Sequence, residues 1–476
     1  MTRITAVHAR EVLDSRGNPT VEVDVHAGNS VGRAIVPSGA STGAAEAHEL
    51  RDTSVGRYGG RGVLQVVHHV NQLIAPVMLG LDAADQAVID ARLLGLDPSR
   101  QKTLLGANAI LGVSLAAAHA AAAAQQIPLF EHINSLWKST PNGTLWTSDP
   151  EKTAPYNHAA ATHHHTTATQ NHGAAGQTAH PAPQPAVLPL KSSAAPAMPL
   201  PMTNLISGGL HAGGNLDFQD FLMMPSGASS YSEALEWLVR VNHRLGIVLT
   251  ESGYEGRLLA DEGGYGPRLR DCRHALDMLV QAIVHSGLEP GRDVTIALDV
   301  ASSHFFRDGR YHLRAEKGIE LTSTQMVDYL VALAADYPIT SIEDGLAEED
   351  WQGWRELTRR LGAQARLVGD DLFATSPERL RRGIELGVGN SVLIKLNQIG
   401  TLSETLETMR LAQAAGYTRV VSARSGETED TTIADLAVGT AAESIKIGAV
   451  KHGERQAKYN QLLRIEERLR GESGKW

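Results

Sequence analysis

The sequence predicts an α/β protein in which a barrel of alternating strands and helices follows an N-terminal α+β domain. Short apolar runs alternate with amphipathic segments from residue 200 to the C-terminus, and this alternation is typical of a closed (β/α) barrel. Near the N-terminus, apolar and polar residues alternate with a period of two, which predicts antiparallel strands. A stretch poor in apolar periodicity, 134–199, separates the two parts.

Residues 1–133 are expected to form the N-terminal α+β domain. The predicted strands are Ile4–Val12, Thr20–Val25 and Gly32–Val36, and the Ala-rich run Ala107–Gln125 predicts a helix buried on most sides. Between them, Val36–Gly43 (VPSGASTG) is too rich in Gly, Ser and Pro for regular structure. Its hydroxyls and free amides suit closure over a phosphate or a metal ion. An ordinary surface turn is the alternative.

The segment 134–199 is crowded with Ala, Pro, Thr and His, and predicts a disordered insertion because it cannot bury enough apolar surface to offset its ordering entropy. Its histidines include His158, His163, His164, His165, His172 and His180. They lack Cys partners and paired helical spacing, which argues against a defined transition-metal site. A role as a lid or a partner-binding segment stays open.

Composition excludes several classes of function. The formal net charge of the 476 residues is −10, which gives no basic face for nucleic acid or anionic lipid. The single cysteine, Cys272, suits a reducing compartment. The N-terminus lacks the apolar core of a signal peptide, and we expect no charge-free apolar run of about 18 residues. The prediction is a cytoplasmic protein that binds neither nucleic acid nor membrane.

The barrel is predicted from short apolar runs that end in polar or charged residues. These runs are Thr295–Val300, Ile339–Asp344, Arg366–Asp371, Ser391–Lys395 and Arg419–Ser422. Amphipathic segments such as Thr324–Ala335 and Thr401–Ala415 lie between them. In barrels of this kind the carboxyl ends of the strands form the active site. The residues at which each run ends are therefore the candidate site residues.

Lys395 lies at the end of the run within NSVLIKLNQIG, residues 390–400. A strand flanked by helical segments is covered on both faces, and a charge there is costly unless a partner or a reaction uses it. The alternative is a lysine whose stem is buried and whose ammonium group reaches solvent.

Three other strand ends carry acids: Asp299, Glu343 with Asp344, and Asp370 with Asp371. If these strands are neighbours, the first acid of each converges at one mouth and needs a cation. Three carboxylates without paired His or Cys suit a hard, oxygen-preferring ion, most simply Mg²⁺. A single strand-end acid is more often a helix cap or a loop hydrogen-bonder, but three on successive strands favour the metal.

Basic groups stand opposite these acids. Lys395, Arg424, Ser425 and Lys446 lie at or just after apolar runs. Arg424 and Ser425, followed by glycine, suit a phosphate, and Lys446 can neutralise a carboxylate. The combination predicts a site for a small, multiply charged acid.

Two loops offer acid and base candidates. The glycine-rich stretch Asn204–Phe221 carries His211, Gln219 and Asp220, and the stretch Ala260–Pro267 presents Glu262 before a Gly-Gly turn. Each signal is weak on its own, because a histidine in a glycine-rich loop is more often structural than catalytic.

The chain resembles the enolase family. The matching stretches are LDSRGNPTVEV, VPSGASTG, LGANAILGVSLA, ADEGG, SIEDGLAEEDW, VGDDLF, IKLNQIGTLSET, SARSGETEDTTIADLAVG and AKYNQLLRIEE. They cover nearly everything except about residues 134–199, in one collinear order. The resemblance implies an N-terminal α+β capping domain, an enolase-type eightfold barrel, a homodimer and two Mg²⁺ ions per active site.

The resemblance also implies roles for individual residues. Asp299, Glu343 and Asp370 would hold the tightly bound ion, and Ser41 would meet a second ion that arrives with substrate. Lys395 would remove the proton α to the carboxylate of 2-phosphoglycerate, and Glu262 would help to expel the hydroxyl as water. Arg424 and Ser425 would hold phosphate, Lys446 the carboxylate, and His211, Gln219 and Asp220 would belong to the covering loop. Two metal ions and Lys446 would be expected to lower the pKa of Lys395.

The chain departs from the family at the hydroxyl end of the site. Ala423 stands where the family has a histidine, and Asp220 stands where it has a glutamate. His304 replaces a usual acid, and Leu210 alters the loop beside His211. One reading is neutral drift in an ordinary enolase. A second is a specialised paralogue, resembling carboxyphosphonoenolpyruvate synthase of phosphinate antibiotic biosynthesis, which accepts a phosphonylated partner activated by a nucleotide. A third is a non-catalytic binding protein, against which the retained Lys395 and the carboxylates argue.

Overall fold

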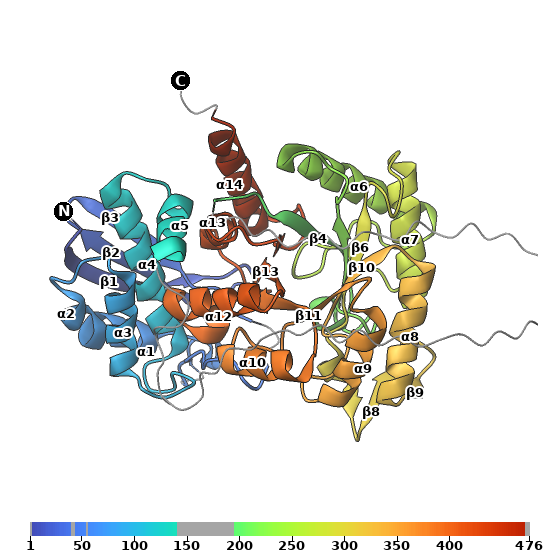
Figure 1. The fold of residues 1–476 in the computed structure, drawn as a ribbon, viewed down its shortest axis with the longest axis horizontal. Helices are drawn as coiled ribbons and strands as arrows, with labels where there is room; N and C mark the ends of the chain where they lie inside the picture. Colours follow the sequence, from blue (N-terminus) through green and yellow to red (C-terminus); the bar gives the residue numbers. More distant parts are fainter. Residues whose placement is uncertain (1, 40–42, 54–55, 140–194, 472–476) are drawn as a thin grey trace, which may run out of the picture.

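The computed structural model describes residues 2–39, 43–53, 56–139 and 195–471. It contains a closed barrel of eight strands and, beside it, an N-terminal domain with its own three-stranded sheet (Figure 1). The N-terminal domain, drawn in blue, lies against the side of the barrel that carries α12, which spans Leu402–Ala414. Ser41 and the insertion histidines His158 to His180 lie outside the described residues.

The N-terminal sheet is antiparallel in the order β1-β2-β3. Its strands are β1 Ile4–Leu13, β2 Pro19–Ala27 and β3 Ser30–Ile35. The helices are η1 Tyr58–Gly60, α1 Leu64–His68, η2 His69–Ile74, α2 Ala75–Met78, α3 Gln86–Leu96, α4 Ala107–Gln125 and α5 Leu129–Ser139. Residues 134–139, read from the sequence as the start of the insertion, continue α5, where Asn134 donates to the backbone oxygen of Gly439 at 2.8 Å.

The central helix of this domain, α4, corrects one expectation from the sequence. Ala107–Gln125 is long and apolar enough to cross a membrane by length and composition alone, and 83% of that stretch is buried inside the protein. From the sequence we predict no run of this length. The apolar character of this one comes mostly from small alanines. Their size explains the burial, since β3 packs so closely on α4 that a Cβ on Gly32 would lie 2.1 Å from the backbone nitrogen of Ala120.

The barrel strands follow the spatial order β10-β11-β12-β13-β14-β4-β5-β6, with β6 closing on β10. They are β4 Leu200–Ser207, β5 Asp220–Met224, β6 Thr295–Asp299, β10 Ile339–Glu343, β11 Arg366–Gly369, β12 Ser391–Ile394, β13 Thr418–Ser422 and β14 Ser444–Lys446. The five runs predicted from the sequence are β6, β10, β11, β12 and β13 within one or two residues. Side chains such as Met202, Leu222 and Leu393 fill the barrel interior, so the barrel is a packed core.

One strand runs against the others. Strand β5 is antiparallel to both of its neighbours, β4 and β6, whereas the remaining pairs are parallel. The stretch Asn204–Phe221, expected as a single glycine-rich loop, contains the end of β4, the short 3-10 turn η3 Gly209–Ala212 and the start of β5. Asp220 is therefore the first residue of a strand and not part of a loop.

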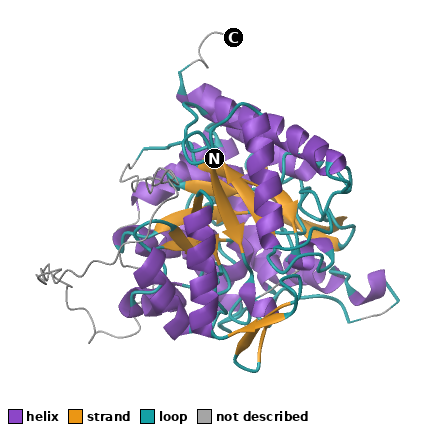
Figure 2. Ribbon diagram, turned by 90° about the vertical axis from the view of Figure 1, so that its right-hand side faces the viewer, coloured by secondary structure: helices purple, strands orange, loops and turns teal. Residues whose placement is uncertain are grey.

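Helices surround the barrel strands (Figure 2). They are α6 Tyr231–Glu251, α7 Cys272–His285, α8 Ser323–Asp336, α9 Trp351–Leu361, α10 Pro377–Leu386, α11 Leu396–Ile399, α12, α13 Thr432–Gly439 and α14 Gly453–Leu469. The turn η4 Ser302–Phe305 and a small sheet of β7 Phe306–Arg307, β8 Arg310–Leu313 and β9 Ile319–Leu321 follow β6. Local sequence fixes several helix starts. Thr322 and Gln325 form a capping box at α8, and Ser376 caps α10, which has proline at its first position.

Candidate active site

Two of the predicted metal ligands lie side by side at the carboxyl ends of neighbouring strands. Asp299 ends β6 and Glu343 ends β10, and the two residues are partners in the strand register. Both are buried, and both accept hydrogen bonds from the ammonium group of Lys446 at the end of β14. Lys446 Nζ lies 2.7 Å from Asp299 Oδ2 and 2.8 Å from Glu343 Oε2. Lys446, expected to neutralise a carboxylate, thus neutralises two from the protein itself.

The third predicted ligand, Asp370, follows β11 and contacts Lys395. Lys395 is the first residue after β12, and its Nζ donates to Asp370 Oδ2. The other oxygen of Asp370 accepts from Gln398 Nε2 at 2.8 Å. Lys395 therefore does not reach bulk solvent as a free ammonium, because its side chain is largely buried and bound to a carboxylate.

Neighbouring charges and burial shift the pKa values of Lys395 and Glu343. Burial acts to lower the pKa of Lys395, but the nearby carboxylates, Asp370 first and then Glu343, together outweigh it, so the pKa is raised. The sequence predicted a lowered pKa of Lys395, because two bound metal ions were assumed and the contact with Asp370 was not predicted. Burial and the charge of Asp299 together raise the pKa of Glu343 well above its ordinary value.

The donor chemistry of Asp299, Glu343 and Asp370 fits a hard divalent cation. All three offer only carboxylate oxygens, which suit Mg²⁺. Among the described residues, the sets of ligand atoms close enough to share an ion are His211 with Asp220 and Glu262, and Asp344 with Asp370 and Asp371. Asp370 alone of the three predicted ligands belongs to such a set. The ammonium group of Lys446 bridges Asp299 and Glu343, and that of Lys395 contacts Asp370.

Asp344 has a role that sequence reasoning missed. It follows β10 with a positive φ of 41°, and its two carboxylate oxygens accept the backbone N–H groups of Asp370 and Asp371 at 2.9 and 2.8 Å. Asp344 thereby fixes the turn after β11 that presents Asp370. The sequence signal was only the acidic pair at this strand end.

The phosphate-binding candidates Arg424 and Ser425 lie just after β13 and are buried. Arg424 Nη1 donates to Glu46 Oε2 and to Asn397 Oδ1, each at 2.8 Å. Ser425 is held through its backbone oxygen, which accepts from Arg455 Nη2 at 2.9 Å. Glu46 comes from the N-terminal domain, and nothing in its local sequence marked it as a site residue. The N-terminal domain therefore contacts a residue that lines the pocket.

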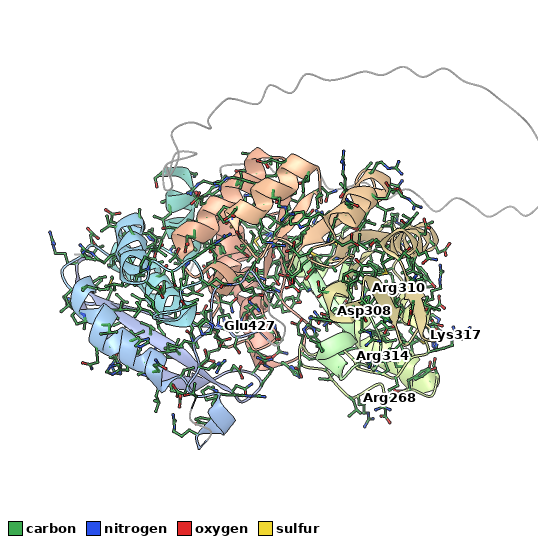
Figure 3. The ribbon with its side chains drawn as sticks, turned by 90° about the horizontal axis from the view of Figure 1, so that it is seen from below. Arg268, Asp308, Arg310, Arg314, Lys317 and Glu427 are labelled. Carbon is green, nitrogen blue, oxygen red and sulfur yellow. The ribbon has the colours of Figure 1, made fainter. Side chains whose placement is uncertain are left out.

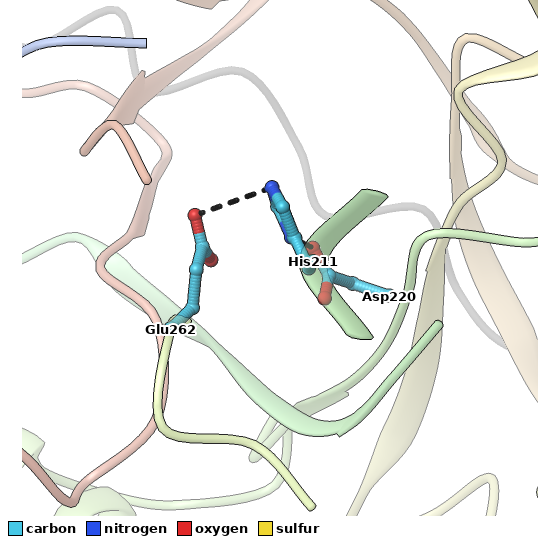
Figure 4. A group of neighbouring side chains, drawn as sticks. All are labelled: His211, Asp220 and Glu262. Atoms are coloured by element: carbon cyan, nitrogen blue, oxygen red, sulfur yellow. Dashed lines mark hydrogen bonds and ion pairs between the residues drawn. The ribbon is translucent and has the colours of Figure 1, made fainter. Parts of the chain in front are cut away.

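The covering-loop residues meet in one buried cluster (Figure 4). His211 lies in η3, and its Nδ1 is 2.9 Å from Asp220 Oδ2 while its Nε2 is 3.9 Å from Glu262 Oε1. Burial opposes the charged imidazole, but the carboxylates of Asp220 and Glu262 raise the pKa of His211 to about 9. Burial also opposes ionisation of Glu262, yet the charges of His211 and Arg455 lower its pKa to about 2.

These residues line a single narrow pocket. Its lining residues are His211, Gln219, Glu262, Asp299, Lys395, Ser422, Ala423, Arg424, Ser425 and Lys446. Its volume is about 330 Å³. Asp220, Glu343 and Asp370 lie behind this lining. Ala423, where the family has a histidine, presents only a methyl group to the pocket.

Several basic side chains lie exposed on the barrel away from the N-terminal domain (Figure 3). They are Arg268, Arg310, Arg314 and Lys317, on the segments that follow the Glu262 loop and strand β6. The other departures from the family pattern are also at the surface, since Leu210 is 53% exposed and His304 in η4 is exposed. Neither Leu210 nor His304 is among the residues that line the pocket.

Comparison with known proteins agrees with both domains. A family model described as enolase, N-terminal domain, matches residues 4–133, and one described as enolase, C-terminal TIM barrel domain, matches residues 195–476. The enolase of Acidothermus cellulolyticus is 48% identical over 470 residues, which covers 98% of this chain and 95% of that protein. Barrel, capping domain and charged pocket define a barrel enzyme of the lyase class. The chain belongs to the enolase family.

Proposed function

We propose that this enzyme forms an enolate from 2-phosphoglycerate and eliminates water to give phosphoenolpyruvate, reversibly and with Mg²⁺. The observation that carries the proposal is the position of Lys395, whose amine lines the same pocket as Arg424 and Ser425. Proton abstraction from a phosphorylated acid requires a base and phosphate-binding side chains in the same pocket. Membership of the enolase family supports the same reaction.

Different residues of the chain bind the phosphate, accept the proton and stabilise the carboxylate. Arg424 and Ser425 hold the phosphate, with Arg424 oriented by Glu46 and Asn397. Lys395 Nζ takes the proton from the carbon next to the substrate carboxylate. It does so in its neutral form, so the contact with Asp370 that raises its pKa has to be broken first. Lys446 supplies positive charge beside that carboxylate, which becomes doubly anionic as the enolate forms.

Asp299, Glu343 and Asp370 would hold one Mg²⁺, and a second is expected with substrate at Ser41. When bound, these ions supply charge that stabilises the enolate. Their ligands lie within reach of the ammonium groups of Lys446 and Lys395.

The direct test follows phosphoenolpyruvate by its ultraviolet absorbance after purified protein is mixed with Mg²⁺ and 2-phosphoglycerate. We expect turnover, and we expect Lys395→Ala to reduce it by about 10²- to 10⁴-fold, the range typical of a lost general base. Lys317→Ala, an exposed lysine outside the pocket, is the matched control and leaves the rate unchanged. A native protein without turnover would falsify the proposal.

A second candidate function has its own supporting observation. Ala423 leaves the pocket wall without the imidazole of the family, which makes room beside the substrate for a bulkier partner. The candidate is a carboxyphosphonoenolpyruvate synthase that uses nucleotide-activated phosphonoformate.

Phosphorus NMR separates the two candidates. A specialised enzyme gives a new phosphonate product only when activated phosphonoformate is added, and it turns over 2-phosphoglycerate negligibly until Ala423→His is introduced. An ordinary enolase turns over 2-phosphoglycerate rapidly without that substitution and gives no phosphonate product.

We also propose that the enzyme is a homodimer, as the family resemblance implies. The mass of one chain is 50.9 kDa. Light scattering after size-exclusion chromatography should give twice this mass, and a monomer mass at micromolar concentration would contradict the proposal.

A further inference from the structure

A separate cavity lies at the other end of the barrel from the charged pocket. It is lined at the amino ends of the parallel strands, where Leu200 begins β4, Arg366 begins β11 and Glu443 directly precedes β14. The antiparallel strand β5 reaches it from its own carboxyl end, because Pro225 follows the last residue of that strand. The cavity and its open mouth enclose about 920 Å³, which gives room for a small organic molecule.

Arg366 is the one positively charged residue among the described residues that line this cavity. It stands two positions before Val368, which belongs to the apolar cluster inside the barrel, so strand alternation turns the side chain of Arg366 inward as well. Only 3% of Arg366 is exposed. Its Nη1 donates to Ser444 Oγ at 2.6 Å, whereas its buried Nη2 has no hydrogen-bond partner within the described part of the chain.

The charge of Arg366 is not neutralised by the acid in the same cavity. Glu443 lines the cavity, but its Oε2 accepts from the backbone nitrogen of Arg419 at 2.8 Å and its Oε1 accepts from Arg419 Nη2 at 2.9 Å. Burial therefore lowers the pKa of Arg366, and the charge of Glu443 opposes this only in part. A buried charge without a counter-ion destabilises a protein, so an anion that binds beside Arg366 would remove that cost.

The remaining lining restricts the chemistry of this anion. One guanidinium balances one negative charge, and the nearby carboxylate of Glu443 disfavours a second charge on the ligand. A carboxylate matches the planar donors of a guanidinium. Leu200, Pro225 and Ala234 give the walls an apolar surface, which suits a compact hydrocarbon body. The cavity therefore fits a monocarboxylate better than a phosphate or a sugar acid.

The N-terminus of α6 borders the same cavity but is already occupied by a carboxylate of the protein. The backbone nitrogens of Tyr231 and Ser232 donate to the two oxygens of Glu466 in α14, at 2.7 and 3.1 Å. These N–H groups are therefore not available to a ligand. Arg366 is left as the group that recognises an anion in this cavity.

We propose that this cavity binds a small aliphatic monocarboxylate, whose carboxylate pairs with Arg366 and whose hydrocarbon body lies against Leu200 and Ala234. The site is separate from the proposed reaction. Arg366 begins β11 and Asp370 follows its last residue, so the two ends of this strand are roughly 13 Å apart at about 3.3 Å per residue. Binding here therefore does not require the charged pocket to be free.

The test is a saturation-transfer NMR titration of the purified full chain with isovalerate, a branched monocarboxylate. We expect binding to native protein that neither isovaleramide nor inorganic phosphate displaces, because the first lacks the charge and the second carries too much. Arg366→Met should weaken binding about 10- to 100-fold, the range expected for a lost hydrogen bond to a charged group. Arg268→Met, the same change at an exposed arginine, is the matched control and leaves binding unchanged.

A second variant tests the cavity with Arg366 in place. Ala228 lines the cavity and is half-buried in the segment before α6, so Ala228→Phe should fill the cavity and abolish binding even if Arg366→Met fails to fold.

Several results would overturn the inference. Native protein that binds no isovalerate, or equal binding in native protein and in folded Arg366→Met or Ala228→Phe, would exclude this site. Displacement by isovaleramide would show that the charge is not recognised. Displacement by 2-phosphoglycerate with Mg²⁺ would place isovalerate in the charged pocket instead.

Discussion

Replacing Glu46 by glutamine tests whether the N-terminal domain takes part in substrate binding. The Glu46 carboxylate accepts from Arg424 Nη1 at 2.8 Å and from Gln398 Nε2 at 3.3 Å, and both Glu46 and Arg424 are buried. Glutamine keeps the shape and one acceptor oxygen but removes the charge. A hydrogen bond to a charged group contributes roughly 1.5 kcal/mol more than a neutral one, which corresponds to about tenfold in affinity. We expect kcat/KM for 2-phosphoglycerate to fall about tenfold, mainly through KM, because Arg424 loses its fixed orientation.

The assay is the steady-state formation of phosphoenolpyruvate over a range of substrate concentrations, with thermal unfolding measured in parallel. Glu356→Gln, which removes a carboxylate from an ion pair on the exposed face of α9, is the control and leaves kcat/KM unchanged. A value of kcat/KM within twofold of native in Glu46→Gln would refute the reasoning. So would a loss confined to kcat, because orientation of the phosphate grip acts first on binding.

Three further predictions concern stability and metal dependence. Glu443→Ala leaves the buried Arg419 without the carboxylate that lies 2.9 Å away, and should lower the free energy of unfolding by about 3–5 kcal/mol in urea titrations. The double variant Glu443→Ala with Arg419→Met should restore part of this loss. Equal losses in the single and double variants would contradict the prediction. Burial raises the pKa of Asp435 to about 7. As pH rises from about 4 to 7, the carboxyl loses its proton in the unfolded state first, so the free energy of unfolding falls. Asp435→Asn should remove this pH dependence and add roughly 2 kcal/mol to the free energy of unfolding at pH 8, and an unchanged pH dependence would disprove the prediction. Chelation by EDTA should abolish turnover and added Mg²⁺ restore it, whereas activity that survives exhaustive chelation would exclude the carboxylate metal site.

The sequence predicted much of the barrel because buried parallel strands have a strong local signal. Asp299, Lys395 and Ser422, at or next to the ends of the runs at β6, β12 and β13, line the pocket, while Glu343 ends β10 and Asp370 follows β11. The rule that active sites lie at the carboxyl ends of barrel strands then brought Asp299, Glu343, Lys395 and Arg424 together without any contact information.

Other features depend on contacts that local sequence does not encode. The run DFLMM of β5 is buried on both faces, so its periodicity carries no information about strand direction. Glu46 joins the site only because two domains pack together. The raised pKa of Lys395 depends on contact with a carboxylate 25 positions earlier in the chain. The hydrogen bonds of Asp220 with Asn204, Ser207 and His211 likewise could not be read from local sequence.

The reversed direction of β5 has a consequence for how this protein can change. In a uniformly parallel barrel the chain leaves the catalytic rim after each strand and returns through a helix on the outside. Here β4 ends and β5 begins at the same rim, so both ends of the segment between Ser207 and Asp220 lie at this rim of the barrel. Substitutions within this hairpin can therefore change the lining of the pocket at His211 and Gln219 without a change in the parallel strands of the barrel.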